Sequence, residues 1–286
     1  RVWNRTPQSA TDHAMTYGTQ AVSLSEAVQA DVIFSCLPTT AEVEALILAN
    51  PPHAGSIWVD CTSGEPIVAQ RLSAFLKEHG AEYLDAPVSG QTIGAENGTL
   101  TVMVGGEPAA LGKARPALEP FSGKIEWVGG SGCGFAVKAI NNTLLAANLL
   151  AAAEGLSVLK AHGVQLDAAL ACINASSGRS MASESVIPQR VLNRGFPLTF
   201  ALDLLAKDTQ IAMDLVLAAR LPAPVLAQSQ SLVRAASLSF AQQWLTMRYQ
   251  QRVADRLRQR LFDQLLHAEW RWLAARRASD MVATLT

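Results

Sequence analysis

The stretch Gly129-Gly-Ser-Gly-Cys-Gly-Phe-Ala-Val-Lys138-Ala-Ile-Asn-Asn142 divides the chain into two parts of different character. Its glycines interrupt regular structure, and from about residue 135 to residue 161 nothing stops a helix, since Gly155 only weakens one. Lys138 and Asn142 are four residues apart, so they lie on one face of that helix, which is otherwise apolar. A lysine in this setting is either a buried functional group or an edge residue whose ammonium reaches water.

Before this stretch, short apolar runs alternate with helical patterns. The runs read as strands without a polar face, at residues 31–37, 56–60, 81–85, 100–104 and 125–128. Such strands, separated by helices, predict a parallel or mixed sheet covered by helices. Val2 and Trp3 predict the end of one more strand. We therefore expect an α/β domain over residues 1–130.

After the stretch the pattern changes, because no convincing strand follows. Helical spacing continues over residues 135–161, 165–174, 200–219 and 224–238. Residues 131–240 therefore predict an all-α domain built on the long interdomain helix. From about Gln242 the chain is rich in Arg and Gln, with an apolar residue every four positions, which predicts an amphipathic helical tail over residues 241–286. A packed terminal helix is favoured there over a nucleic-acid or membrane contact.

The composition of the 286 residues is that of a chain with a sizeable core. Apolar residues make up 49% and charged residues 16%, and the net charge of −1 gives no general attraction for nucleic acid or an anionic membrane. The apolar run over residues 143–153 is too short to span a bilayer, and no signal peptide is visible, so we predict a cytoplasmic protein. The four cysteines have no metal-binding spacing, so we expect buried free thiols and no metal site.

Small polar residues follow several of the expected strands. In a doubly wound sheet, ligands bind beyond the C-terminal ends of the strands. Turn residues are common there, so each group alone is a weak signal. Together they predict a ring of polar side chains and open backbone amides around one site, formed by Asn4-Arg5-Thr6, Leu37-Pro38-Thr39-Thr40, Thr62-Ser63 and Asp85-Ala-Pro-Val-Ser89-Gly90.

Arg5 indicates which dinucleotide this site would take. After the second strand of a dinucleotide-binding unit, an acidic residue would bond the ribose 2′-hydroxyl and select NAD. This chain has no acid there, and Arg5 lies between Asn4 and Thr6. A guanidinium suits a 2′-phosphate, which calls for a charge-assisted bidentate partner. NADP(H) is therefore the favoured cofactor, with NAD as the alternative.

Seven stretches in unbroken order resemble one family. They are Trp3-Asn-Arg-Thr, Leu37-Pro38, Val59-Asp-Cys-Thr-Ser, Asp85-Ala-Pro-Val-Ser-Gly90, Gly98-Thr-Leu-Thr-Val-Met-Val-Gly-Gly106, Gly132 through Lys138 to Asn142, and Leu204-Leu-Ala-Lys207-Asp208. Through them, residues 1–238 resemble the β-hydroxyacid dehydrogenases, a 6-phosphogluconate dehydrogenase-like family that includes 3-hydroxyisobutyrate dehydrogenase, tartronate semialdehyde reductase and threonate dehydrogenase.

The resemblance implies a Rossmann-type domain followed by a helical domain, and it implies roles for particular residues. Lys138 would be the catalytic acid/base. Ser89 and Gly90 would hold the substrate carboxylate, with Gln91 next to them and Asn142 beside the reacting hydroxyl. The cofactor would be lined by Asn4, Arg5, Thr6, Leu37, Pro38, Thr62 or Ser63, and Lys207.

The chain departs from the family pattern in three places. The family's opening strand and Gly-rich phosphate loop would precede Arg1, so we expect an N-terminal truncation, and expect residues 1–286 alone to bind a dinucleotide weakly and to be inactive. Gly90 is followed by Gln91, where the family usually has a second glycine, and this side chain would narrow or repolarise the substrate pocket. The tail after about Gln242 does not resemble the family's C-terminus.

The residues agree with the chemistry that the resemblance implies. Burial on an apolar helix face lowers the pKa of a lysine from its ordinary value of about 10.4, which makes Lys138 a usable base. Asn142 can hold an oxygen without titrating, and no histidine or aspartate is expected in a comparable position. We therefore predict an oxidoreductase that transfers a hydride between NADP(H) and a short β-hydroxyacid or semialdehyde of the 3-hydroxyisobutyrate, tartronate semialdehyde or threonate type.

Two other functions stay open. An imine reductase of the same architecture is disfavoured by Lys138, because that branch generally lacks the lysine. A non-catalytic interaction module is disfavoured by the intact set of Ser89, Lys138, Asn142 and Lys207. The long apolar helix predicts a homodimer or homotetramer, and a small-molecule substrate is the expected partner, not nucleic acid or a membrane.

Overall fold

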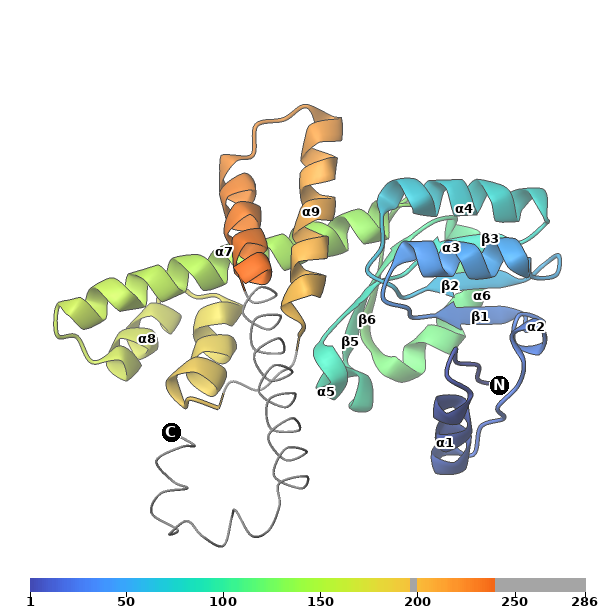
Figure 1. Cartoon of the computed structure of the whole chain (residues 1–286), viewed down its shortest axis with the longest axis horizontal. Coiled ribbons are helices and arrows are strands. Elements are labelled where there is room, and N and C mark those ends of the chain that lie inside the picture. Colours follow the sequence, from blue (N-terminus) through green and yellow to red (C-terminus); the bar gives the residue numbers. More distant parts are fainter. Residues whose placement is uncertain (196–199, 240–286) are drawn as a thin grey trace, which may run out of the picture. The chain divides into compact units, whose positions relative to one another are not determined.

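The computed structural model describes residues 1–195 and 200–239 (Figure 1). Residues 1–234 form one compact unit, and a second unit begins at Ala235. The amphipathic tail expected over residues 241–286 lies outside the described residues. The first unit holds the sheet and the helical layer that the sequence predicts.

Six strands form one mixed sheet in the order β1-β2-β3-β5-β4, with β6 paired to β5. β1, β2 and β3 are parallel, whereas β5 runs antiparallel to β3 and β4 and parallel to β6. The strands are β1 (Val32–Ser35), β2 (Ile57–Asp60), β3 (Glu82–Asp85), β4 (Val88–Ser89), β5 (Leu100–Gly105) and β6 (Ser122–Gly129). The predicted parallel or mixed sheet is confirmed.

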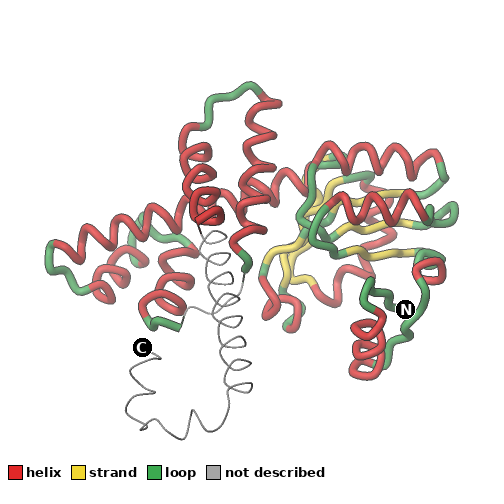
Figure 2. Tube along the Cα trace, viewed as in Figure 1, coloured by secondary structure: helices red, strands yellow, loops and turns green. Residues whose placement is uncertain are grey.

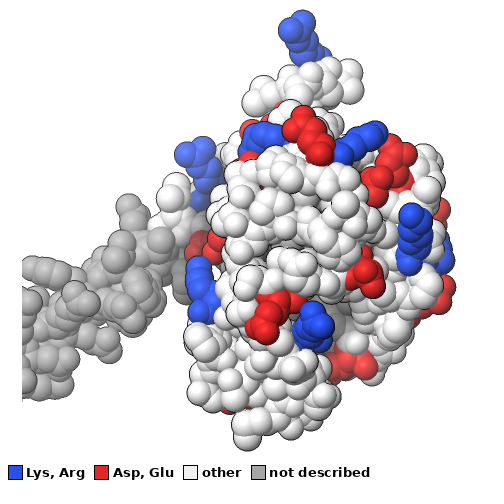
Figure 3. All heavy atoms as spheres, turned by 90° about the vertical axis from the view of Figure 1, so that its right-hand side faces the viewer, with Lys and Arg blue, Asp and Glu red and all other residues white. Residues whose placement is uncertain are grey.

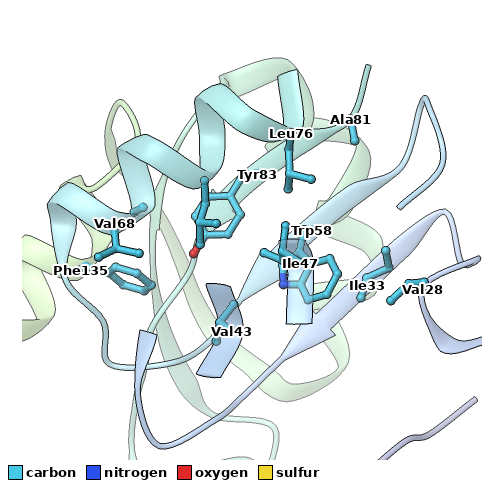
Figure 4. Packing of buried hydrophobic residues seen from close by; sticks show 12 residues of the cluster. Val28, Ile33, Val43, Ile47, Trp58, Val68, Leu76, Ala81, Tyr83 and Phe135 are labelled. Carbon is cyan, nitrogen blue, oxygen red and sulfur yellow. The ribbon is translucent and has the colours of Figure 1, made fainter. Parts of the chain in front are cut away.

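Each face of the sheet buries its own apolar cluster, which explains the strands without a polar side. On one face, Trp58 of β2 packs in a cluster with residues of α3 (Thr40–Ala49) and α4 (Pro66–Glu78). On the other face, Val59 packs with residues of α6 (Pro108–Leu118). Because side chains alternate along a strand, neighbouring residues of β2 serve opposite clusters. Figure 4 shows the first cluster, in which Phe135 lies beside Val68 of α4.

The N-terminal segment lies outside the six-stranded sheet. Val2 forms a parallel bridge with Ala21, and not with a strand of the six-stranded sheet. Between these residues lies α1 (Pro7–Tyr17), and the short α2 (Leu24–Ala27) leads into β1. The edge of β1 that faces away from β2 has no partner strand among the described residues.

The helical layer is built on α7 (Cys133–Ala161), a single helix of 29 residues, as the sequence predicts (Figure 2). Near its start, Ala139 packs against Ile211 of α9 (Leu202–Ala219). Near its end, Leu156 packs with residues of α8 (Leu166–Asn174) and η2 (Ala182–Leu192). Residues 224–239 are also helical. η2 is a π-helix that the sequence patterns missed, as they missed β4, α5 (Gln91–Glu96) and the 3₁₀ turn η1 (Glu119–Phe121).

α7 is also long and apolar enough to cross a membrane, by length and composition alone, and 11% of its most apolar window is buried. One such helix is weak evidence for a membrane, because core helices of other proteins pass the same test.

Two expectations about side chains can be compared with the structure. The four cysteines are free; Cys36 and Cys172 are exposed, so the prediction of buried thiols is wrong for these two, whereas Cys61 and Cys133 are partly buried. On the face shown in Figure 3, acidic and basic side chains are interspersed and no patch of one sign gathers.

Candidate active site

The C-terminal ends of β1, β2 and β3 are joined by the carboxylate of Asp60. It is completely buried and accepts hydrogen bonds from the Ser35 hydroxyl at 2.9 Å, the Thr62 amide at 3.0 Å and the Tyr83 hydroxyl at 2.7 Å. Burial raises the pKa of Asp60, and the hydrogen bonds from Thr62 and Tyr83 oppose that rise. The three donors therefore hold the ends of three neighbouring strands around one charge.

The loops after β1 and β2, in which the sequence predicts cofactor contacts, are tied together. The Thr62 hydroxyl accepts a hydrogen bond from the amide of Leu37 at 3.1 Å, and the Thr40 hydroxyl accepts one from the amide of Glu65 at 2.9 Å. Thr62 is buried and its hydroxyl is used inside the protein, whereas Ser63 is half-buried. Leu37, Pro38 and Ser63 therefore border one region beyond the strand ends.

The turn Asn4-Arg5-Thr6 lies against the first turn of α3. The Asn4 side chain accepts a hydrogen bond from the amide of Thr6 at 2.8 Å, and Arg5 forms an ion pair with Glu42 at 3.3 Å. The Arg5 side chain is 83% exposed. Since an exposed ion pair of this kind is weak, it leaves the guanidinium able to exchange partners.

Asp85, at the end of β3, holds the start of α7. One of its carboxylate oxygens accepts a hydrogen bond from the amide of Gly132 at 2.8 Å, and the other accepts one from the amide of Phe135 at 3.0 Å. Burial raises the pKa of Asp85 to about 6, and these amide hydrogen bonds oppose a larger rise. A Cβ at Gly134 would collide with the backbone oxygens of Asp85 and Met103, so only glycine allows this close approach.

One turn further along α7, four polar side chains from two helices meet. The Asn142 amide donates to one oxygen of Asp208 at 2.6 Å, and the Lys207 ammonium donates to the other at 2.8 Å and to the backbone oxygen of Ser63. Lys138 is half-buried, and burial lowers its pKa; the charge of Asp208 opposes this effect and that of Lys207 adds to it. The predicted Lys138, Asn142 and Lys207 therefore belong to one cluster that reaches the loop after β2.

The position of Asp208 contradicts one prediction from the sequence. No aspartate was expected in a position comparable with that of Lys138, yet Asp208 is 1% exposed and bonds Asn142 directly. Its place directly after Lys207 was visible in the sequence. The contact with Asn142 was not, because 66 residues separate the two.

The residues predicted to bind the substrate carboxylate form the segment after β4. Ser89 pairs with Thr101 of β5, and Gly90 has φ of 135°. A Cβ at Gly90 would lie 2.9 Å from the side chain of Leu100, so the backbone approaches β5 closely. Gln91 follows, and its side-chain oxygen accepts a hydrogen bond from Arg190 of η2 at 2.9 Å. Local sequence patterns give no sign of this contact.

The polar groups at the strand ends suit a dinucleotide. The Ser131 hydroxyl oxygen, at the start of α7, is buried without a hydrogen-bond partner among the described residues. The Lys207 ammonium and the exposed Arg5 guanidinium add two cations. An unpartnered hydroxyl, open strand ends and cations fit the hydroxyl and phosphate groups of a nucleotide cofactor.

A cavity of about 670 Å³ lies elsewhere, at the far end of α7. Its lining includes Lys160, 22 positions after Lys138, which corresponds to about 33 Å along a helix. The cavity includes none of the predicted site residues; besides Lys160 it is lined by Gly163, Val164, Gln165, Leu166, Asp167, Pro188, Leu192 and Asn193.

Comparisons with known proteins agree with this geometry. Residues 1–129 match the NAD binding domain of 6-phosphogluconate dehydrogenase, and residues 132–247 match the NAD-binding domain of NADP-dependent 3-hydroxyisobutyrate dehydrogenase. The chain is 35% identical to 2-(hydroxymethyl)glutarate dehydrogenase of Eubacterium barkeri, over 75% of this chain and 74% of that protein. It is also 35% identical to NAD-dependent L-serine dehydrogenase of Pseudomonas aeruginosa, over 79% of this chain and 80% of that protein.

Solved structures lead to the same family. A structure of 3-hydroxyisobutyrate dehydrogenase from Mycobacterium tuberculosis with L-serine is 30% identical, with a TM-score of 0.77 over 83% of this chain and 85% of that one. An imine reductase from Pseudomonas is 18% identical with a TM-score of 0.55, over 83% of this chain and 85% of that one, which shows a shared fold alone. The chain therefore belongs to the 3-hydroxyisobutyrate dehydrogenase-like family of NAD(P)-dependent hydroxyacid dehydrogenases.

Proposed function

We propose that the protein transfers a hydride between NADP(H) and a short β-hydroxyacid or its semialdehyde, of the 3-hydroxyisobutyrate, tartronate semialdehyde or threonate type. The observation that carries this proposal is the half-buried Lys138, one turn of α7 before an asparagine whose amide is held by Asp208. This lysine favours a hydroxyacid over an imine as substrate. The cluster places the Lys138 amine, which can exchange a proton, beside the Asn142 amide, which cannot.

Lys138 acts on the proton of the reacting hydroxyl. The nicotinamide supplies the hydride chemistry when it is bound. In the oxidation, Lys138 in its neutral form accepts the hydroxyl proton, and in the reduction its ammonium returns a proton to the same oxygen. Burial lowers the pKa of Lys138 from its ordinary value, so the neutral form is present at lower pH than for an exposed lysine.

Asn142 and the segment after β4 orient the substrate. Asp208 takes one N–H of the Asn142 amide, and the second N–H can donate to the reacting oxygen. Ser89 and the backbone of Gly90 suit the substrate carboxylate, because a hydroxyl and an unobstructed amide can both donate to it. In this proposal, these contacts hold the reacting hydroxyl of the substrate beside Lys138, and none of them adds a second titrating group.

The C-terminal ends of β1 and β2 would hold the cofactor in this proposal. Leu37, Pro38 and Ser63 border it, and Lys207 closes it from α9. Arg5, beside Asn4 and Thr6, pairs with the 2′-phosphate after leaving Glu42. NADP(H) is therefore preferred over NAD(H).

Self-association through the helical layer is the third part of the proposal. Large apolar side chains are exposed at several positions along it, and exposed apolar surface can mark an interaction site. They are Val137, Leu144 and Val158 of α7, Leu204 and Leu217 of α9, and Leu221, Val225 and Leu232 after it. A homodimer or homotetramer would cover them.

In a protein that also carries the phosphate loop expected before Arg1, replacing Lys138 by alanine should lower kcat by about 10²- to 10⁴-fold, because a general acid/base is removed. NADPH affinity, measured by fluorescence titration, should stay nearly unchanged. Lys138→Arg should not restore turnover, since arginine stays protonated. Lys160→Ala, at the other end of the same helix, is the matched control. A folded Lys138→Ala protein with kcat within about threefold of the parent would contradict the assignment.

Arg5→Asp should reverse the cofactor preference. A hydrogen bond to a charged group contributes about 1.5–3 kcal/mol, so the ratio of kcat/KM for NADPH and NADH should fall by about 10- to 100-fold. Arg71→Asp is the control, because Arg71 is also paired with a glutamate of α3. Steady-state kinetics with both cofactors measures the ratio. Equal efficiency of the two cofactors in the parent would rule out the role of Arg5.

Light scattering at micromolar concentration should give the mass of a dimer or tetramer. Leu144→Glu should shift the protein toward the monomer, because it places a charge on the exposed apolar face of α7. Leu48→Glu, at an exposed leucine of α3, should leave the mass unchanged. A monomeric parent protein would show that this face serves another purpose.

A further inference from the structure

Gln91 has a backbone conformation that is unfavourable for its type. Its φ is 62°, in the left-handed region where glycine is ordinary and a residue with a Cβ is disfavoured. It directly follows Gly90, and it begins α5. The side chain is therefore present at a local energetic cost.

That contact fixes the orientation of the Gln91 amide. Its oxygen accepts a hydrogen bond from a guanidinium nitrogen of Arg190 at 2.9 Å, across 99 residues of sequence. Arginine can only donate, so the oxygen must face Arg190 and the amide nitrogen must point elsewhere. The bond is charge-assisted, and it lies on the exposed surface of the protein. Gln91 thus presents a donor, not an acceptor, to whatever lies beside it.

Arg190 is held on the helical layer by its own helix. It belongs to η2, a π-helix, and such helices are rare and frequent at functional sites. Three residues earlier, Ile187 is 3% exposed and packs with Leu156 of α7 and Leu170 of α8. The side chain of Arg190 therefore extends from a packed element, and the Gln91 contact joins the segment after β4 to the helical layer.

The position of Gln91 relates this donor to one part of the substrate. In the proposed function, Ser89 and Gly90 hold the carboxylate, and Gln91 is the next residue along the chain. In a β-hydroxyacid, the atom next to the carboxylate is the α-carbon with its substituent. In the proposed function, the amide nitrogen of Gln91 would therefore be the group that meets that substituent.

We infer that Gln91, oriented by Arg190, is a specificity-determining residue that selects β-hydroxyacids with a hydroxyl group on the α-carbon. This inference rests on the proposed function. An α-hydroxyl accepts the hydrogen bond from the amide nitrogen. An α-methyl group cannot, and it would cover the amide without bonding it. An α-ammonium group has no acceptor, so it is disfavoured as well.

Four acids that differ only at the α-carbon test the inference. They are glycerate, 3-hydroxypropionate, 3-hydroxyisobutyrate and L-serine, with hydroxyl, hydrogen, methyl and ammonium substituents. In the parent, kcat/KM for glycerate should exceed that for each of the others by about tenfold or more, since a site built to bond a hydroxyl rejects analogues that lack it. The readout is this ratio, measured with NADP⁺ on a protein that carries the phosphate loop expected before Arg1 as well as residues 1–286.

Three variants separate the parts of the inference. Gln91→Gly removes the side chain, Gln91→Glu keeps an acceptor for Arg190 but has no donor for the substrate, and Arg190→Met releases the amide. Each should bring the ratio of glycerate to 3-hydroxyisobutyrate down by about tenfold. Arg179→Met breaks the exposed pair between Arg179, which precedes η2, and Glu184 of η2, and it should leave the ratio unchanged. Gln91→Gly should not lower the Tm, because glycine suits the local φ.

Two outcomes would overturn this inference and leave the proposed dehydrogenase function standing. One is a parent enzyme that oxidises another of the acids as well as or better than glycerate. The other is a ratio that stays within about twofold of the parent in both Gln91 variants. Oxidation of any of the acids supports the dehydrogenase function independently of the ratio. If none is oxidised, the proposed function fails and the inference fails with it.

Discussion

Three buried carboxylates hold this protein together at the places where its parts meet. Asp60, Asp85 and Asp208 are each at most 1% exposed. A charge removed from water is costly unless donors surround it, so each carboxylate requires partners from the segments around it. Asp60 collects donors from the ends of β1 to β3, Asp85 joins β3 to the start of α7, and Asp208 joins α7 to Lys207 of α9. Because each carboxylate lies where two or more elements meet, the hydrogen bonds that it accepts also align those elements.

The same arrangement sets the electrostatics of the candidate active site. Lys138 follows the turn of α7 that Asp85 holds, so its position along the sheet edge is determined by that cap. Burial lowers the pKa of Lys138, Lys207 lowers it further, and Asp208 raises it. Asp208 therefore does two things at once, since it orients the Asn142 amide and limits the loss of the proton from Lys138. The carboxylate of Asp208 thus acts both on Lys207, with which it is paired, and on the pKa of Lys138.

The sequence predicted what depends on local periodicity and on the quoted motifs. The local pattern predicted strands that are apolar on both faces and an uninterrupted helix after Gly134. The motifs around Lys138 indicated the family. The rest depends on contacts between distant residues. Asp208 and Asn142 are 66 residues apart, and Gln91 and Arg190 are 99 apart, so no spacing reveals them. η2 was missed because a π-helix with Pro188 inside it departs from the helical period of about 3.6 residues.

The pH dependence of hydroxyacid oxidation tests the central claim that Asp208 tunes Lys138. Oxidation needs neutral Lys138, so kcat/KM should rise with pH through the pKa of that lysine in the free enzyme. Asp208→Asn removes a negative charge that favours the ammonium, so the rise should move to lower pH; Asp214→Asn, on the same helix, should leave it in place. A profile of Asp208→Asn that coincides with that of the parent would contradict the account.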